Sequence, residues 1–338
     1  MSEADPAQRL CEALRASRGF LHKQDIGSAM DLLAQARPVA APGVLSVPNG
    51  DDCAAIADGA GGHLLFAIEG FVDDFVEREP WFAGWCGVMV NLSDVAAMGG
   101  RPLAVVDALW SADSAAAEPL MQGLVAACEH YGVPLVGGHS NHRSSRSQLA
   151  VAVLGRARRL LTSFDARPGD VLVMAVDLRG RWQEPYPYWN AATGAPAERL
   201  RADLELLPQL AEAGLADAAK DISMAGVLGT ALMLLDCSRA GAVIDVDAIP
   251  RPPTVTEGDD AALLRWLTAF PSYGFVLSVR PAQVPAVLRH FQARDIAAAA
   301  IGEVTAAPTV QLHHRGGRAP LWDLAARPFI TARGPAHG

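Results

Sequence analysis

The apolar segment from Trp81 to Met98 constrains the fold more than any other stretch of this 338-residue chain. Its periodicity predicts one long helix, which Gly99-Gly100 and then Pro102 bring to an end. Because an apolar helix face needs a partner surface, this helix must pack inside a domain. Residues of the expected buried face recur at 4-3-4-3 spacing and are Trp81, Trp85, Val88, Leu92 and Val95.

Strand and helix patterns alternate on both sides of this helix and predict an α/β (α+β) protein. The expected N-terminal elements are a helical stretch over 1–36 interrupted at Gly19 and Gly27, strands over 63–69, 103–110, 133–137 and 148–156, and a helix over 115–131. The expected C-terminal elements are strands over 171–178, 242–246, 274–279 and 298–304, and helices over 197–213, 224–238 and 281–293. A chain of 338 residues is longer than those that usually fold around a single hydrophobic core. We therefore expect two domains, 1–160 and 161–330, with a frayed tail over 331–338.

Charge and composition exclude several classes of protein. The net charge is −9, with 28 basic and 37 acidic residues, which argues against a nucleic-acid binder. No apolar run is long enough to span a membrane, and the N-terminus is polar, without a secretory segment. The five cysteines are scattered and form no CxxC pair, which favours a reducing, cytoplasmic location over disulfides or a zinc site.

Two segments carry candidate metal ligands. Asp51 and Asp52 follow Gly50, and adjacent carboxylates repel unless a cation such as Mg²⁺ lies between them. An ordinary solvated turn is the alternative. Within the long helix, Asn91 and Asp94 continue a stripe that begins with two glycines, Gly84 and Gly87. A buried Asp there needs a metal or a structural partner.

Two further segments are candidates for binding a ligand. A predicted strand runs into Gly137-Gly138-His139-Ser140, and the edge where strands end commonly binds ligands. His139 is a candidate catalytic residue or a structural one. Lys220-Asp221 precedes Ser223 at a predicted helix start, an arrangement suited to phosphate and its metal or to a helix cap. The chain has only one other lysine, Lys23.

The segment 179–190 combines arginines, aromatic residues and two prolines. It is interpreted either as a recognition loop for a flat or anionic ligand or as a packed crossover that covers the sheet. The candidate substrate-binding residues in it are Arg181, Trp182, Tyr186, Tyr188 and Trp189.

No P-loop and no GxGxxG motif is present. Together, however, the Gly50-Asp51-Asp52 turn, the Asn91-to-Gly99 helix segment, Gly137-Gly138 and Lys220-Asp221-Ile222-Ser223 resemble a known superfamily in order and spacing. It comprises the PurM-like proteins: aminoimidazole ribonucleotide (AIR) synthase, thiamine-monophosphate kinase and selenophosphate synthetase. The segments 179–190 and 270–275 look closer to its uncharacterised AIR-synthase-related branch linked to nitrilase gene clusters, and to a methanogenesis-marker branch.

The resemblance implies a two-domain fold whose N-terminal sheet forms a barrel across a homodimer and whose C-terminal sheet is flanked by helices. It also implies ATP and Mg²⁺ in the cleft between domains. Carried over to this chain, the metal ligands are Asp51, Asp52, Glu69, Asp94 and Asp221; the nucleotide-binding residues are Asn91, Gly137, Gly138 and Ser223; and the catalytic residues are Lys220, Asp221 and His139.

Departures from the thiamine-monophosphate kinase pattern bear on the substrate. His139-Ser140 and Met224-Ala225 replace an Asp-Thr and an Asp-Gly pair, and 270–274 replaces an acidic segment. The resulting hypothesis is an ATP- and Mg²⁺-dependent phosphotransferase or synthetase for another small metabolite. The alternative is a nucleotide-binding subunit that has lost catalysis and serves a partner enzyme.

Overall fold

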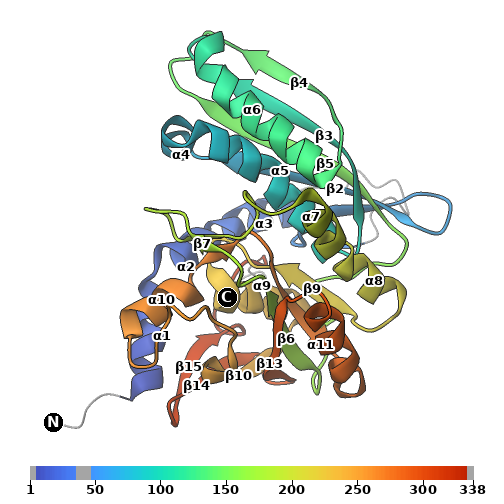
Figure 1. The fold of residues 1–338 in the computed structure, drawn as a ribbon. Coiled ribbons are helices and arrows are strands. Elements are labelled where there is room, and N and C mark those ends of the chain that lie inside the picture. The colour runs from blue at the N-terminus through green and yellow to red at the C-terminus, as the bar shows by residue number, and fades with distance from the viewer. Residues whose placement is uncertain (1–4, 36–46, 333–338) are drawn as a thin grey trace.

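The computed structural model describes residues 5–35 and 47–332 and contains two mixed sheets, each flanked by helices (Figure 1). The first sheet has the order β1-β2-β5-β3-β4, and helices α5 and α6 pack together over it. Within the described residues, no helix is long and apolar enough to cross a membrane. The first half comprises β1 (Ala54–Ala57), β2 (His63–Phe71), α4 (Asp73–Arg78), α5 (Pro80–Ala97), β3 (Arg101–Trp110), α6 (Ser114–Tyr131), β4 (Leu135–Asn141) and β5 (Gln148–Ala157).

Helix α5 forms where it was predicted, but from Phe82 to Ala97 it is buried on all sides and not on one face, while Trp81, expected on the buried face, is 37% exposed. The first sheet covers one side, α6 another, and β9 of the second sheet a third. A Cβ atom at Gly84 would lie 2.1 Å from the Leu120 carbonyl oxygen of α6. Only glycine therefore allows the two helices to approach this closely. The central position of α5 brings its C-terminal half to the junction of the two sheets.

The other face of the first sheet carries exposed apolar side chains. Along β2, Leu65 and Ala67 are buried, whereas Phe66 and Ile68 are 49% and 67% exposed. This alternation is typical of a strand whose two sides have different surroundings. The exposed set on the sheet comprises Phe66, Ile68, Leu103, Val106, Val136 and Leu154.

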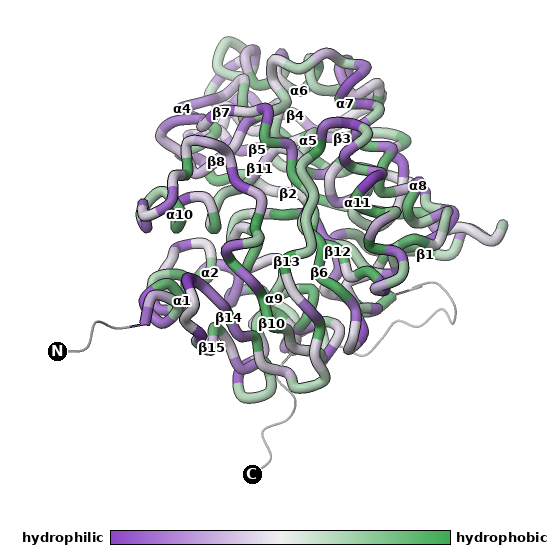
Figure 2. Tube along the Cα trace, turned by 60° about the horizontal axis from the view of Figure 1, so that its bottom comes forward, coloured by the Kyte–Doolittle hydropathy of each residue, from purple (hydrophilic) through white to green (hydrophobic). Residues whose placement is uncertain are grey.

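The second sheet has seven strands in the order β15-β14-β10-β13-β6-β12-β9 and is covered on both faces. Along β6, Leu172, Met174 and Val176 join one apolar cluster, while Val173 and Ala175 join another on the opposite face. Figure 2 shows hydrophobic colouring along the central strands of this sheet. The second half comprises β6 (Val171–Val176), β7 (Arg181–Trp182), β8 (Tyr188–Asn190), α7 (Ala197–Leu204), α8 (Leu206–Glu212), β9 (Ala218–Asp221), α9 (Gly226–Ser238), β10 (Gly241–Asp245), α10 (Asp260–Leu267), β11 (Phe270–Pro271), β12 (Gly274–Val279), α11 (Val284–Gln292), β13 (Ala297–Thr305), β14 (Thr309–His314) and β15 (Gly317–Asp323).

The N-terminal helices correct the expected division at residue 160. Helix α1 (Pro6–Ala16) packs on β14 and β15, and α2 (Arg18–Lys23) on α9, so both join the second domain. The chain breaks before α2 and before α3 (Asp25–Gln35), not at Gly19 and Gly27. A Cβ atom at Gly19 would lie 2.4 Å from the carbonyl oxygen of Met224. This glycine therefore permits a close contact between α2 and the segment before α9.

Several expected boundaries also shift. The helix expected over 197–213 is divided into α7 and α8, and the strand expected over 133–137 continues to Asn141. Lys220 and Asp221 end the buried strand β9 and do not start a helix; α9 begins at Gly226. The segment 179–190 contributes β7 and β8 to a small third sheet with β11. Most of the tail expected over 331–338 lies outside the described residues.

Candidate active site between the two sheets

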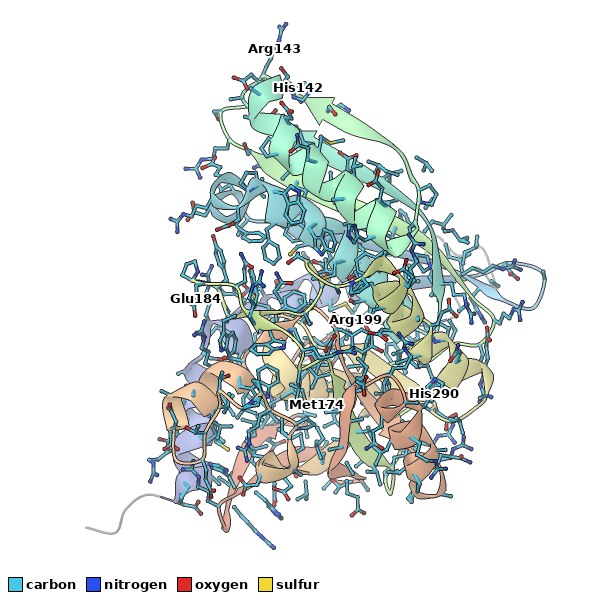
Figure 3. The ribbon with its side chains drawn as sticks, in the orientation of Figure 1. His142, Arg143, Met174, Glu184, Arg199 and His290 are labelled. Atoms are coloured by element: carbon cyan, nitrogen blue, oxygen red, sulfur yellow. The ribbon has the colours of Figure 1, made fainter. Side chains whose placement is uncertain are left out.

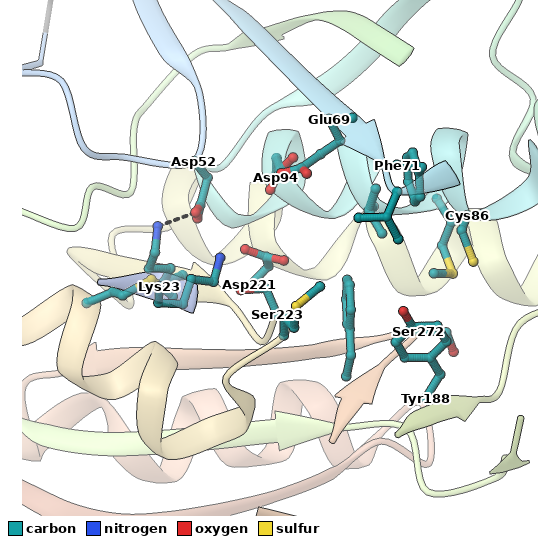
Figure 4. A pocket seen from close by; sticks show the side chains of 18 of the residues that line it. Lys23, Asp52, Glu69, Phe71, Cys86, Asp94, Tyr188, Asp221, Ser223 and Ser272 are labelled. Atoms are coloured by element: carbon teal, nitrogen blue, oxygen red, sulfur yellow. Dashed lines mark hydrogen bonds and ion pairs between the residues drawn. The ribbon is translucent and has the colours of Figure 1, made fainter. Parts of the chain in front are cut away.

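A cavity of about 300 Å³ lies between the two domains. Its walls come from β2 and α5 of the first domain and from α2, β8, β9 and β11 on the other side. Figure 4 shows carboxylates gathered at one end, where Asp52, Glu69, Asp94 and Asp221 approach one another. Phe71, Cys86 and Tyr188 lie toward the other end. The cavity thus has an acidic end and an apolar end.

The acidic end is built by three carboxylates from distant segments. Asp52 follows the Gly50 turn, Asp94 lies near the end of α5, and Asp221 ends β9. One carboxylate oxygen from each of the three lies within 4.8 Å of the others. The backbone of Asp221 is held by pairing with Phe275 of β12, and the N–H of Ile222 donates to the Gly274 carbonyl. We call these three residues the carboxylate cluster.

Lys220 provides the cluster with one positive charge. Its Nζ pairs with Oδ1 of Asp52, and both side chains are nearly inaccessible, at 6% and 5% exposure. The Oδ2 atom of Asp52 is buried and accepts no hydrogen bond from residues 5–35 or 47–332. Within the described residues, no donor reaches the side-chain oxygens of Asp94 or Asp221 either. Three carboxylates and one lysine would leave two negative charges uncompensated if all were ionised.

Burial and the excess of negative charge raise the pKa values of two carboxylates in the cluster. Burial, and then the neighbouring Asp221 and Asp52, raise the pKa of Asp94 well above its ordinary value. Burial, followed by Asp52, raises the pKa of Asp221 to about 8. Burial alone would lower the pKa of Lys220, but the carboxylates of Asp52, Asp51 and Asp221 outweigh it and raise that pKa. The site therefore favours bound cations or protons.

The remaining two predicted ligands occupy different surroundings. Asp51 accepts hydrogen bonds from the backbone N–H and hydroxyl of Ser163, at 2.9 and 2.7 Å, which turns its carboxylate toward that loop. Glu69 lines the cavity near the cluster but is not one of the three carboxylates whose oxygens converge. Burial raises the pKa of Glu69. The structure thus distinguishes three convergent carboxylates from two flanking ones.

The predicted nucleotide-binding residues do not all meet. Ser223 lines the cavity, and its backbone N–H donates to the Thr230 hydroxyl at 3.4 Å. Asn91 is buried one turn before Asp94; its amide donates to the Gly87 carbonyl at 2.8 Å, and its Oδ1 has no partner within the described residues. Asn91 does not line the cavity.

Gly137, Gly138 and His139 lie elsewhere in this chain, exposed on β4 at the edge of the first sheet. They do not line the cavity. Figure 3 places His142, just after β4, at the far tip of the first domain, well away from Met174 in the second sheet. A single copy of the chain therefore does not bring His139 to the carboxylate cluster.

The aromatic segment satisfies parts of both interpretations. Tyr188 and Trp189 line the cavity, whereas Arg181, Trp182 and Tyr186 do not. Trp182 packs edge-to-face on Trp189 at 5.4 Å, under the guanidinium of Arg265. Tyr186 stacks on Tyr188 with ring centroids 5.3 Å apart. Trp182 and Tyr186 therefore support the cavity wall from behind, whereas Arg181 is exposed.

Sequence analysis did not identify Lys23 as a site residue. It ends α2 and lines the cavity, so both lysines of the chain reach the same site. Lys23 forms no ion pair within the described residues. The scarcity of lysine could have identified Lys23 as a site residue, because the chain has only two lysines. The apolar wall gave no such signal, since phenylalanine and methionine are ordinary core residues.

The cluster has the chemistry of a Mg²⁺ site. Its donors are hard carboxylate oxygens, the kind that Mg²⁺ shares with substrate phosphates and water. The Oδ2 atom of Asp52 is buried and has no hydrogen-bond donor in the described part of the chain, and a cation would compensate its negative charge. The residues present therefore fit a divalent cation, which Asp52, Asp94 and Asp221 would hold.

Comparisons with known proteins agree with this architecture. The N-terminal domain of AIR synthase related proteins matches residues 50–157, and the corresponding C-terminal domain matches 185–315. An uncharacterised protein of Synechocystis is 46% identical over 95% of this chain and 97% of its own. A thiamine-monophosphate kinase of Synechococcus elongatus is 30% identical over 78% of this chain and 86% of its own.

The fold also matches a larger solved protein. Thermotoga maritima PurL, solved with ATP, superposes with a TM-score of 0.71 at 20% identity. The match covers 96% of this chain but only 52% of PurL, so this chain spans about half of that protein. With both family domains matched in order and a two-sheet fold of the same kind, this chain belongs to the AIR synthase-related, PurM-like family.

Proposed function

We propose that this protein is an ATP- and Mg²⁺-dependent phosphotransferase or synthetase acting on a small metabolite. The observation that carries the proposal is the carboxylate cluster, whose oxygens converge within 4.8 Å beside both lysines of the chain. Cations that neutralise phosphate charge are the main requirement of phosphoryl transfer. Two relatives support it by name, one a kinase and one solved with ATP.

The residues have separate tasks in this proposal. Asp52, Asp94 and Asp221 hold Mg²⁺, which when bound would neutralise charge on the triphosphate. Lys220 and Lys23 supply further positive charge. An acceptor oxygen bonds to the γ-phosphorus, the bond from that phosphorus to the β–γ bridging oxygen breaks, and ADP leaves with the bonding electrons. The acceptor's proton passes to a carboxylate at the acidic end.

The test is calorimetric titration with the ATP analogue AMPPCP, with and without Mg²⁺, followed by ADP formation from ATP. We expect Mg²⁺-dependent binding that Asp221→Asn weakens by roughly tenfold or more, about 1.4 kcal/mol. The matched control Asp74→Asn changes an exposed carboxylate of α4 and leaves binding unchanged. Binding that is equally tight without Mg²⁺, or unaffected by Asp221→Asn, contradicts the proposal.

We further propose a homodimer formed through the first sheets. The exposed apolar face, including Ile68 and Val136, is a surface that a second copy would cover. Such a dimer is also the means by which His139, on β4, can reach a cavity of the other copy. Sedimentation at micromolar concentration tests it: we expect a dimer, and Ile68→Glu should shift it to a monomer. A monomeric parent protein contradicts this part.

The second candidate function is a nucleotide-binding subunit without catalysis. Met224 favours it, since this residue lines the cavity and stands where thiamine-monophosphate kinases carry a carboxylate. The same titration separates the candidates. A catalytic protein forms ADP when an acceptor is supplied, whereas a binding subunit shows Mg²⁺-dependent affinity for AMPPCP and no turnover with any acceptor.

A further inference from the structure

The apolar end of the cavity differs in chemistry from the acidic end. We call it the aromatic chamber and define it by Phe71, Phe75, Phe82, Met89, Tyr188 and Phe270. Phe75 is its centre, with edge-to-face contacts to Phe82 at 6.0 Å and Tyr188 at 5.6 Å. Edge-to-face walls of this kind suit a flat ring.

Among the residues that the structure describes, none with a charged side chain lies in the aromatic chamber. The described charged residues that line the whole cavity are the carboxylates at the acidic end and the two lysines, and no described arginine lines it. A triphosphate that ran through the aromatic chamber would lay its phosphates against phenylalanine and methionine, which desolvates charge without a partner. The base of ATP is separated from its γ-phosphate by a ribose and two phosphates. The phosphates of ATP are therefore expected at the acidic end, which leaves the aromatic chamber for a group without charge.

The same count of charges bears on the acceptor itself. Lys220 is already paired with Asp52, which leaves Lys23 as the one unpaired cation among the described residues that line the cavity. A triphosphate at the cluster would engage Lys23. An acceptor that carried its own phosphate would then find no cation in the aromatic chamber.

Two donors stand free within the aromatic end. The Tyr188 hydroxyl has no hydrogen-bond partner in the described part of the chain. The Ser272 oxygen accepts from the Ala191 N–H at 2.9 Å, which leaves its own proton available. Figure 4 shows Ser272 and Tyr188 on the side of the cavity away from Asp52 and Asp94. A ring with a hydrogen-bond acceptor on its far edge would be held by them.

We propose that the acceptor is an uncharged aromatic or heteroaromatic alcohol that carries no phosphate of its own. Its ring occupies the aromatic chamber and its hydroxyl faces the carboxylate cluster. This inference rests on the proposed function for the fate of the hydroxyl, but the preference of the chamber for an uncharged ring is independent of it.

The test uses benzyl alcohol and benzyl phosphate as probes with the full chain, Mg²⁺ and AMPPCP. Saturation-transfer NMR and chemical-shift titration report binding. We expect millimolar binding of benzyl alcohol, and binding of benzyl phosphate weaker by roughly tenfold, since its charge would be buried without a partner. Glycerol, a polyol without a ring, should not bind.

A variant with a positive charge in the chamber wall sharpens the test. Phe71→Lys places a cation in the chamber wall at a partly exposed position and should reverse the preference, so that benzyl phosphate binds more tightly than benzyl alcohol. The matched control Val125→Lys adds the same charge on the exposed side of α6 and should leave the parent preference intact.

Three results would overturn the inference: equal or tighter binding of benzyl phosphate by the parent, no binding of either probe, or displacement of benzyl alcohol by AMPPCP. The last would assign the chamber to the base of ATP. Failure of the proposed function is distinguishable, because it would appear as loss of Mg²⁺-dependent AMPPCP binding while benzyl alcohol still bound and Phe71→Lys still reversed the preference.

Discussion

Two groups of buried aspartates in this protein are compensated in opposite ways. Asp177 and Asp203, on the second domain, are surrounded by three arginines: Arg179, Arg199 and Arg294. Arg294 donates to one Asp203 oxygen at 2.7 Å and Arg179 to the other at 3.2 Å. Figure 3 shows Arg199 between the two sheets.

The carboxylate cluster has three acids and a single directly paired cation, Lys220. Burying an anion without a partner is costly, so a fold selected for stability alone would have supplied more donors. The arginine-rich group shows that this chain can do so. The contrast shows that an incomplete set of partners, more than burial or acidity, is the observation that supports the proposed cation site.

The largest expected effect belongs to the compensated group. Asp203→Asn leaves three guanidinium groups with one carboxylate and should lower the free energy of unfolding by about 3 kcal/mol. Binding of Mg²⁺ and AMPPCP by the folded protein should not change. Urea unfolding measures the change in stability, and calorimetric titration measures the affinity for AMPPCP with Mg²⁺. A variant that lost affinity but kept its stability would contradict the assignment of Asp203 to a structural, and not a ligand-binding, group.

An Asp-to-Asn substitution in the carboxylate cluster should raise the stability of the metal-free protein and not lower it. Asp94→Asn removes one of three repelling carboxylates, so the metal-free protein should unfold at a higher temperature than the parent. Affinity for AMPPCP with Mg²⁺ should fall by roughly tenfold or more, about 1.4 kcal/mol. Thermal unfolding in EDTA and titration with Mg²⁺ measure these changes. Unchanged affinity in a folded variant would exclude Asp94 as a ligand.

The pH dependence of stability distinguishes protons from metal at the cluster. Burial and Asp52 raise the pKa of Asp221 from 3.8 to about 8, so the folded state holds a proton that the unfolded chain releases between these values. Stability of the metal-free protein should therefore decrease as pH rises from about 4 to about 8. Saturating Mg²⁺ takes the place of the proton and should flatten this slope. A metal-free protein whose melting temperature is constant over this range would contradict the prediction.

The smallest effect is expected at Lys23. Lys23→Met removes a positive charge from the cavity and keeps the length of the side chain, so the affinity for AMPPCP with Mg²⁺ should fall about threefold, under 1 kcal/mol. The stability of the metal-free protein should change little, because Lys23 forms no ion pair within the described residues. Lys23→Arg, which keeps the charge, serves as the matched control and should retain most of the affinity.

The acidic end was predictable from sequence and the aromatic chamber was not. Asp52 follows a glycine turn and Asp94 lies near a helix end, where a carboxylate is conspicuous, and Asp221 stands out beside one of only two lysines. Phe71 and Met89 sit in apolar segments that predict core positions equally well. Whether such a residue faces a cavity depends on how two domains meet, which local periodicity does not encode.

The errors in the fold predicted from sequence also arise from contacts between distant segments. The helix at 80–98 was predicted well because its pattern is long and ends in two glycines. Strand β9 was missed because four residues, 218–221, are too short to show a period, and they form a strand only through pairing with β12. The N-terminal helices were assigned to the wrong domain because their partners, β14 and β15, lie some 300 residues later in the chain.

That last contact links the order of synthesis to the completion of the site. Arg15 of α1 donates to the carbonyl oxygens of Pro320 and Leu321, and Cys11 packs against Ala319. Helix α1 therefore buries its apolar side only after β14 and β15, some 300 residues later in this sequence, have been synthesised. Helix α2 follows α1 directly and ends in Lys23, which lines the cavity. A chain interrupted before β15 consequently lacks the surface on which the helix preceding Lys23 docks.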